Sequence, residues 1–124
     1  MAVYKGEWSC FSDVFYQFPD GVGEAQLVYA SYEAEQYEGS ALVVWAKDGQ
    51  LWEDSSSHCS CNGLWDDGPS PEATSVEAFL MRPNQDRHLI AALFAWVQQS
   101  WEVKACERGA VLASPAGRAI LLRQ

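Results

Sequence analysis

The stretch ALVVWAKDGQLWED, residues 41–54, decides the fold. Two runs of strand-forming residues flank Asp48-Gly49, the dipeptide most typical of a two-residue type I′ hairpin turn, because both turn positions need a positive φ. This turn places Trp45 opposite Trp52, and such cross-strand aromatic pairs stabilise one register over others. The alternation then assigns the opposite face of the hairpin to Leu42, Val44, Ala46 and Leu51. The sequence therefore predicts an antiparallel hairpin at the centre of a sheet.

The segments on either side of the hairpin are a strand and two polar stretches. Residues 25–32 are rich in strand formers and predict a strand, followed by a polar loop over residues 33–39. Residues 50–54 are expected to form the last strand of the hairpin. The polar residues Glu53 and Ser55 predict that this strand lies near an edge of the sheet. Ser, Gly, Pro and Asp dominate residues 55–74, which predicts a long loop.

Helical periodicity marks three segments. The first contains Phe11, Val14, Phe15 and Phe18 on one helical face, with Ser9 as its cap. Thr74 to Glu77 fits a capping box at the start of a short second helix. An apolar stripe predicts a long helix over residues 86–108, which ends before Gly109.

These elements predict a single α+β domain over residues 1–124. In it, a small antiparallel sheet of three to five strands packs against the long helix, accompanied by short helices. The segment 110–124 fits two structures. Ser114 to Gly117 suits either a turn between two strands, which is favoured, or the start of a helix with Pro115 at its first position.

Charge is distributed unevenly along the chain. Residues 1–80 contain 14 Asp and Glu against two Lys, whereas residues 81–124 contain three acidic residues against six Lys and Arg. A largely acidic chain repels phosphate, so direct binding of nucleic acid is not expected, and a basic protein surface suits it better. The longest apolar run, residues 89–97, is far shorter than a membrane span of roughly 20 residues. With no signal-peptide pattern at the N-terminus, we expect a cytoplasmic protein with no membrane partner.

The stretch HCSCNGLW, residues 58–65, concentrates the chemistry of the chain. His58, Cys59 and Cys61, completed by Cys106, form a candidate zinc site, although one residue between cysteines is a tighter spacing than structural zinc sites use. A cysteine-dependent enzyme is a further alternative, but a base adjacent in sequence points away from its neighbour, so no catalytic residue is assigned. The favoured interpretation is a loop that these residues hold in place, with no cofactor.

A second set of candidate residues is acidic and aromatic. Tyr beside carboxylates is typical of the rim and hot spot of a protein interface. The candidate partner-binding residues are Glu33, Glu35, Tyr37, Glu38, Trp65, Asp66 and Asp67.

Residues 29–82 resemble a family of small proteins of unassigned function that are encoded by bacteriophages and prophages. The shared pieces are Tyr37-Glu38-Gly39, Asp48-Gly49-Gln50-Leu51, the Ser-His-Cys-Ser-Cys-x-Gly-Leu block from Ser57 to Leu64, and Pro71-Glu72. The resemblance implies a protein that acts in the cytoplasm of an infected bacterium. It also implies a non-enzymatic protein that binds a host or phage protein, as inhibitors of anti-phage defence such as anti-CRISPR proteins do. The oligomeric state is left open.

Overall fold

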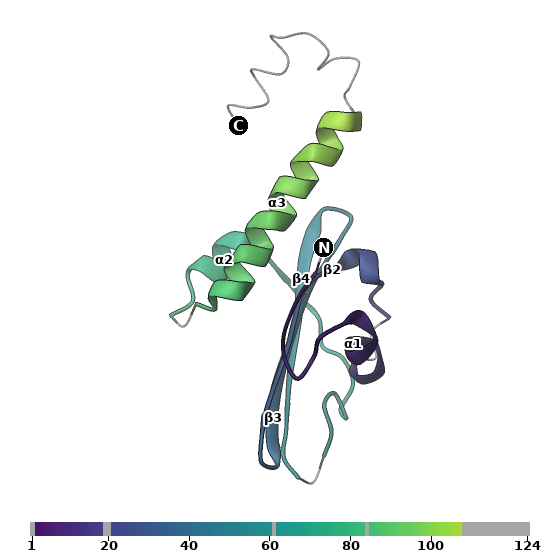
Figure 1. The fold of residues 1–124 in the computed structure, drawn as a ribbon, viewed down its shortest axis with the longest axis vertical. Coiled ribbons are helices and arrows are strands. Elements are labelled where there is room, and N and C mark those ends of the chain that lie inside the picture. Colours follow the sequence, from purple (N-terminus) through teal and green to yellow (C-terminus); the bar gives the residue numbers. More distant parts are fainter. Residues whose placement is uncertain (1, 19–20, 61, 84, 108–124) are drawn as a thin grey trace. The chain divides into compact units, whose positions relative to one another are not determined.

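The computed structural model describes the backbone of residues 2–18, 21–60, 62–83 and 85–107, and their side chains through Ser100. The chain divides into two compact units, Met1–Leu93 and Phe94–Gln124, and the sheet belongs to the first. The elements are β1 (Val3–Gly6), α1 (Phe11–Gln17), the 3-10 turn η1 (Glu24–Gln26), β2 (Leu27–Glu35), β3 (Glu38–Lys47), β4 (Gln50–His58), β5 (Glu72–Thr74), α2 (Val76–Leu80) and α3 (Arg87–Glu107). Figure 1 shows them along the chain.

The fold is α+β, with one mixed sheet of five strands in the order β1-β2-β3-β4-β5. The central hairpin has the predicted register, with Trp45 opposite Trp52 and φ of 54° and 79° at Asp48 and Gly49. The prediction of a purely antiparallel sheet is wrong at one edge, because β1 pairs in parallel with β2. Neither β1 nor β5 was expected as a strand, since both are short segments stabilised by a long-range neighbour.

The segment expected as a polar loop over residues 33–39 is instead the continuation of β2 and β3. The turn contains only Gln36 and Tyr37, and Glu35 pairs with Glu38 directly beside it. β4 likewise extends beyond residue 54 to His58, opposite Gly39. Charged and serine-rich residues can form these strands because their side chains stay in water at the end of the sheet, while the main chains pair.

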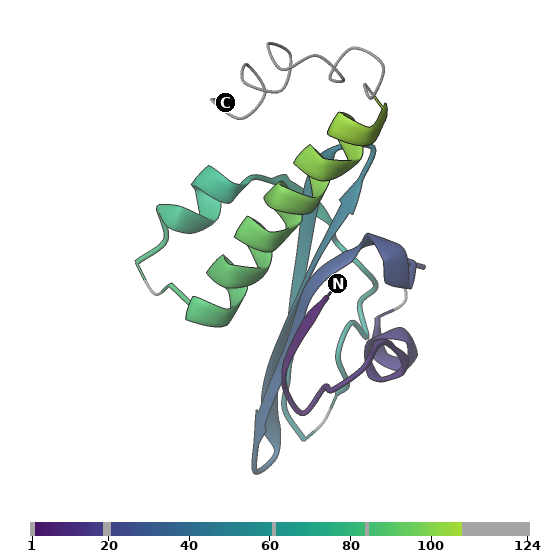
Figure 2. The same cartoon turned by 45° about the horizontal axis from the view of Figure 1, so that its top comes forward.

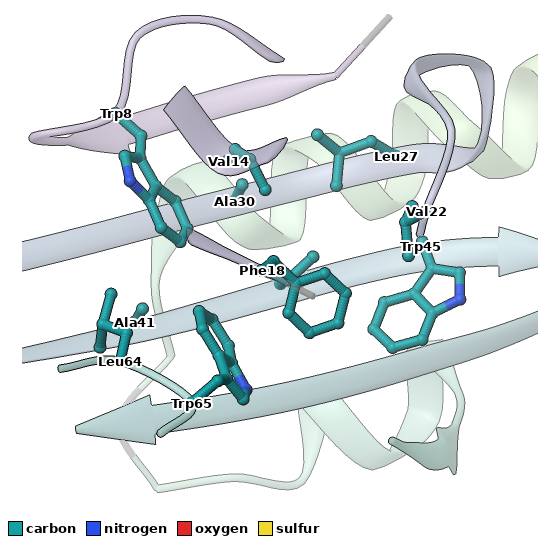
Figure 3. Packing of buried hydrophobic residues seen from close by; sticks show 11 residues of the cluster. Trp8, Val14, Phe18, Val22, Leu27, Ala30, Ala41, Trp45, Leu64 and Trp65 are labelled. Carbon is teal, nitrogen blue, oxygen red and sulfur yellow. The ribbon is translucent and has the colours of Figure 1, made fainter. Parts of the chain in front are cut away.

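One face of the sheet carries an aromatic core, drawn in Figure 3. The Phe18 ring lies between Trp45 and Trp65, with ring centroids 5.4 and 4.8 Å away. Trp8 stacks on the other side of Trp65 at 6.3 Å and approaches Tyr32 at 5.5 Å. Helix α1 and the loop after β4 thus cover this face with rings whose burial supplies much of the stabilisation.

The opposite face meets α2 and the first residues of α3, as Figure 1 and Figure 2 show. Phe79 of α2 and Leu89 and Leu93 of α3 are buried. The helix α3 spans Arg87–Glu107, but only residues 87–93 belong to the same unit as the sheet. The predicted packing of a long helix along the sheet is therefore not shown, and the expectations for residues 110–124 lie outside the described residues.

The short helices differ from expectation at their starts. Ser75, not Thr74, caps α2, because its hydroxyl accepts a hydrogen bond from the Ala78 amide. At α1 the cap position is Cys10, and Asp13 reaches back to accept the Ser9 amide. Phe15 is exposed although Val14 and Phe18 are buried, so the predicted apolar face of α1 does not lie wholly against the core.

Candidate functional site

The β2–β3 hairpin gathers four of the candidate partner-binding residues at its tip. Tyr37 sits in the two-residue turn with 74% of its surface exposed. Glu35 and Glu38 flank the turn as a cross-strand pair, and Glu33 lies two residues before Glu35 in β2. We call this group, which consists of Glu33, Glu35, Tyr37 and Glu38, the acidic tip. Lys5 lies 3.7 Å from Glu33, and no other ion pair reaches the acidic tip from the described residues.

An open depression of about 740 Å³ lies between the acidic tip and the end of β4. Figure 2 shows the hairpin tip beside the loop that follows β4. The described residues that line the depression include no Lys or Arg; they are Glu33, Ala34, Glu35, Glu38, Gly39, Ser40, Ser57, His58, Cys59 and Asn62. The depression is therefore a negatively charged, solvent-open surface with one imidazole in its wall.

His58 has a fixed place in that wall. Its Nδ1 lies 3.2 Å from the Cys59 carbonyl oxygen and its Nε2 lies 2.5 Å from the Tyr32 hydroxyl. A carbonyl can only accept, so Nδ1 carries the proton and Nε2 accepts from the Tyr32 O–H. Gly39 makes room for this pair, because a Cβ there would lie 2.6 Å from Nε2. The His58 Nε2 lone pair is thus engaged by the Tyr32 hydroxyl.

Cys59 forms no metal site with the other residues that the structure describes. Among the residues that the structure describes, no group of three His, Cys, Asp or Glu side chains is arranged to hold a metal ion. Cys59 is disulfide-bonded, and its amide donates to Asn62 Oδ1 at 3.1 Å. Cys61 and the side chain of Cys106 lie outside the described part of the chain. The zinc and thiol-enzyme interpretations therefore stay predictions.

Trp65 is buried rather than available to a partner, which corrects its assignment. It is 7% exposed, and its Nε1 donates to Asp54 Oδ1 at 3.1 Å. Its φ of 54° is a left-handed conformation that bulky residues rarely adopt. The Trp65 amide donates to Ser56 Oγ, and with the indole contacts this bond holds the loop against β4. Trp65 is therefore an anchor of the loop.

The other two loop candidates line a second depression, of about 480 Å³, along β4. Asp66 accepts the Gly63 amide at 2.7 Å, and both Asp66 and Asp67 line this depression. It shares Ser40, Ser57 and Asn62 with the first depression, so the two depressions adjoin. The fold thus brings Asp66 and Asp67 near residues that also line the depression beside the acidic tip, although at least 27 residues lie between them and the tip in sequence.

Asp54 is a buried carboxylate that the sequence did not single out. It is 3% exposed, and it accepts Trp65 Nε1 on one oxygen and the Ser70 amide on the other. Alternation within the hairpin was the available signal, because residue 54 lies opposite Val43 on the core face. Asp54 fixes both ends of the loop that carries Asp66 and Asp67.

A contrasting carboxylate lies on the other face of the sheet. Asp86 Oδ2 accepts the Tyr29 hydroxyl at 2.7 Å and Lys5 Nζ at 3.0 Å. Burial raises the pKa of Asp86, but hydrogen bonds from Tyr29, Lys5 and the His88 amide outweigh burial and lower this pKa to about 2. Burial, followed by the bond to Asp86, raises the pKa of Tyr29. This cluster ties β1 and β2 to the start of α3.

Comparison with known proteins leaves the site to be interpreted from its own geometry. No protein-family model, curated protein or solved structure matches the chain. Within the described residues, no helix has the length and apolar character needed to cross a membrane.

Proposed function

We propose that this protein binds another protein through the acidic tip and the depression beside it. The observation that carries the proposal is Tyr37, an exposed aromatic ring on a tight turn between Glu35 and Glu38, two carboxylates that form no ion pair with any described residue. Tyrosine supplies a large contact area at a low entropic cost, so it is frequent among hot spots. Carboxylates around such a ring favour a basic partner and accelerate the encounter with it.

The partner is a basic surface of a host or phage protein in an infected bacterium. The resemblance to phage-encoded proteins supports a role in blocking a host factor, such as a component of anti-phage defence. Such an inhibitor needs a surface and no catalytic group, and the engaged His58 side chain suits this role. Phosphate would meet the repulsion of Glu33, Glu35 and Glu38, so a protein is preferred over nucleic acid as the partner.

The proposal is tested with the immobilised full-length chain and a lysate of the bacterial host, followed by titration calorimetry with the purified partner. Tyr37→Ala should weaken binding by at least about tenfold, the effect of losing a hot spot. The matched control is Tyr16→Ala, which removes a tyrosine ring from α1 that is also largely exposed (85%). Equal affinity of Tyr37→Ala and the wild type, or no partner at micromolar concentration, contradicts the proposal.

The electrostatic part has its own test. Glu35→Lys and Glu38→Lys should lower the association rate at low salt, and the difference should shrink as salt screens the charges. Glu77→Lys on α2 introduces the same charge change away from the acidic tip. An association rate that falls equally in all three variants would attribute the effect to net charge alone.

A further inference from the structure

The outer edge of β4 is the feature that carries a further inference. The edge is the side of β4 that faces away from β3, at Ser55–Ser57. Lys47 and Gln50 flank a two-residue turn, so they form a hydrogen-bonded pair, and such pairs alternate along an antiparallel ladder. Asp54 and Ser56 are therefore the residues whose main chains bond to β3. The N–H and C=O groups of Ser55 and Ser57 point to the outer side.

The strand β5 covers this outer side only in part. It pairs with residues 51–53 and ends at Glu72. Pro71 has no N–H to continue the ladder, and the Ser70 amide donates to Asp54 Oδ2 at 2.7 Å. The chain therefore leaves the edge before Ser55. Ser55 and Ser57 are both exposed, and no strand that the structure describes pairs with their outer side.

The surroundings of this edge are acidic. Ser55, Ser56, Ser57, Asp66 and Asp67 are among the residues that line the second depression, which adjoins the first, whose lining includes Glu35 and Glu38. None of the described residues that line either depression is Lys or Arg. Exposed main-chain donors and acceptors next to carboxylates suit an extended segment with cationic side chains. A second copy of the chain, with its own net charge of −9, would meet repulsion.

We propose that β4 at Ser55–Ser57 accepts an extended, Lys- or Arg-bearing segment of the partner protein as an added strand. Main-chain hydrogen bonds to Ser55 and Ser57 supply affinity, and the carboxylates of Asp66, Asp67 and the acidic tip select cationic side chains. This inference rests on the proposed protein-binding function and specifies its binding mode. Strand addition also gives a role to the three serines at 55–57, which are not needed to form the hairpin.

The probe is a fluorescent heptapeptide that alternates Lys with Val, and its control has Glu in place of Lys. Anisotropy at low salt should show binding of the Lys peptide to the full-length protein, with at least about tenfold weaker binding of the Glu peptide. Amide exchange of the complex should slow at Ser55 and Ser57. The Ser56 amide, which is already engaged with β3, is the internal control.

Two variants complete the test. Ser55→Pro removes an outward N–H but no hydrogen bond to β3. This variant should bind the Lys peptide at least about tenfold more weakly than the wild type does. Asp67→Asn keeps the edge intact, removes one carboxylate, and should weaken binding by about twofold to fivefold at low salt. The Asp67 variant keeps the proposal testable if the proline variant does not fold.

The outcomes separate the two proposals. Protection at Ser55 and Ser57 with loss of binding in either variant supports strand addition. Binding that leaves these amides unprotected and is abolished by Tyr37→Ala overturns strand addition but not the proposed function. No binding of the Lys peptide, or equal binding of the Glu peptide, overturns strand addition by a cationic segment. A concentration-dependent dimer that Ser55→Pro disrupts would identify a second copy as the occupant and also overturn it.

Discussion

The central strand β3 runs between two turns of equal length and opposite character. At one end Asp48 and Gly49 adopt φ of 54° and 79°, with residues that accept these angles readily, and the paired Trp45 and Trp52 follow. At the other end Gln36 has φ of 57°, an angle that costs a non-glycine residue energy. Two glutamates face each other beside this second turn. The first turn suits folding, whereas the second retains backbone strain and charge repulsion.

The largest test of this comparison removes one aromatic ring from each end. Trp45→Ala should lower the free energy of unfolding by about 3–5 kcal/mol, because Trp45 is buried against Phe18. Tyr37→Ala should change it by less than about 0.5 kcal/mol, since that ring is exposed. Denaturant unfolding of both variants measures the difference. Comparable losses would mean that the acidic tip is part of the core.

Acid titration tests the contribution of Asp86, whose carboxylate accepts hydrogen bonds from Tyr29, Lys5 and the His88 amide. The Asp86 pKa falls from an ordinary value of 3.8 to about 2 on folding, so its contribution is present above pH 4 and is lost as the pH falls toward 2. We expect a loss of about 1–2 kcal/mol over this window after allowance for partial exposure. Tyr29→Phe removes one stabilising bond and should reduce this acid-dependent part. An unchanged pH profile in Tyr29→Phe would contradict the assignment.

The conformation of the first turn is tested by Gly49→Ala. Nothing lies within 4 Å of the added Cβ, so the cost arises from its positive φ alone. A loss of about 1–2 kcal/mol is expected in thermal or denaturant unfolding. Gly23→Ala is the matched control, because Gly23 has φ of −80° and an ordinary contact at 3.7 Å. Equal effects at both glycines would show that φ is not the cause.

The same register shows how much of the fold was predictable. Counting outward from the Asp48–Gly49 turn places Gly39 opposite His58, as observed. The Glu-rich residues 33–39 and the Ser-rich residues 55–57 have the composition of loops, which predicts that the strands stop short of them. Composition reports exposure to solvent, and here the exposed segments are strands. Local patterns therefore predicted the hairpin and its faces but underestimated its length.

The rest of the site depends on contacts between distant residues. The parallel pairing of β1 has no local signal, whereas Trp65 belongs to the stretch that the favoured interpretation assigns to a loop held in place. Trp65 is buried because Asp54, 11 residues earlier, supplies an acceptor for its indole. Charge and aromaticity select the candidate residues of the acidic tip and Asp66 and Asp67, and their role in binding stays a prediction. That the two depressions share lining residues follows only from the folded chain.

The strain in the second turn is tested by Gln36→Gly. Glycine adopts φ of 57° without a steric penalty, although it costs more backbone entropy on folding. We expect a net gain of about 0.5–1 kcal/mol in the free energy of unfolding. Tyr37→Gly is the control, since only Gln36 of this turn has a positive φ, and there glycine should bring the entropic loss alone. If Tyr37→Gly raises the free energy of unfolding, or if Gln36→Gly does not, then the positive φ of Gln36 is not a source of strain in this turn.

The smallest expected effect concerns the repulsion between Glu35 and Glu38, which face each other across the hairpin. Glu38→Gln keeps the shape of the side chain and removes one charge, so it should stabilise the fold by about 0.2–1 kcal/mol at low salt. Near 1 M salt, screening over about 3 Å should abolish this gain, which distinguishes charge from packing. Thermal unfolding at the two salt concentrations measures it. A gain that persists in high salt would mean that Glu38 is unfavourable for a reason other than charge. Charge repulsion between Glu35 and Glu38 would then no longer support a basic partner for the acidic tip.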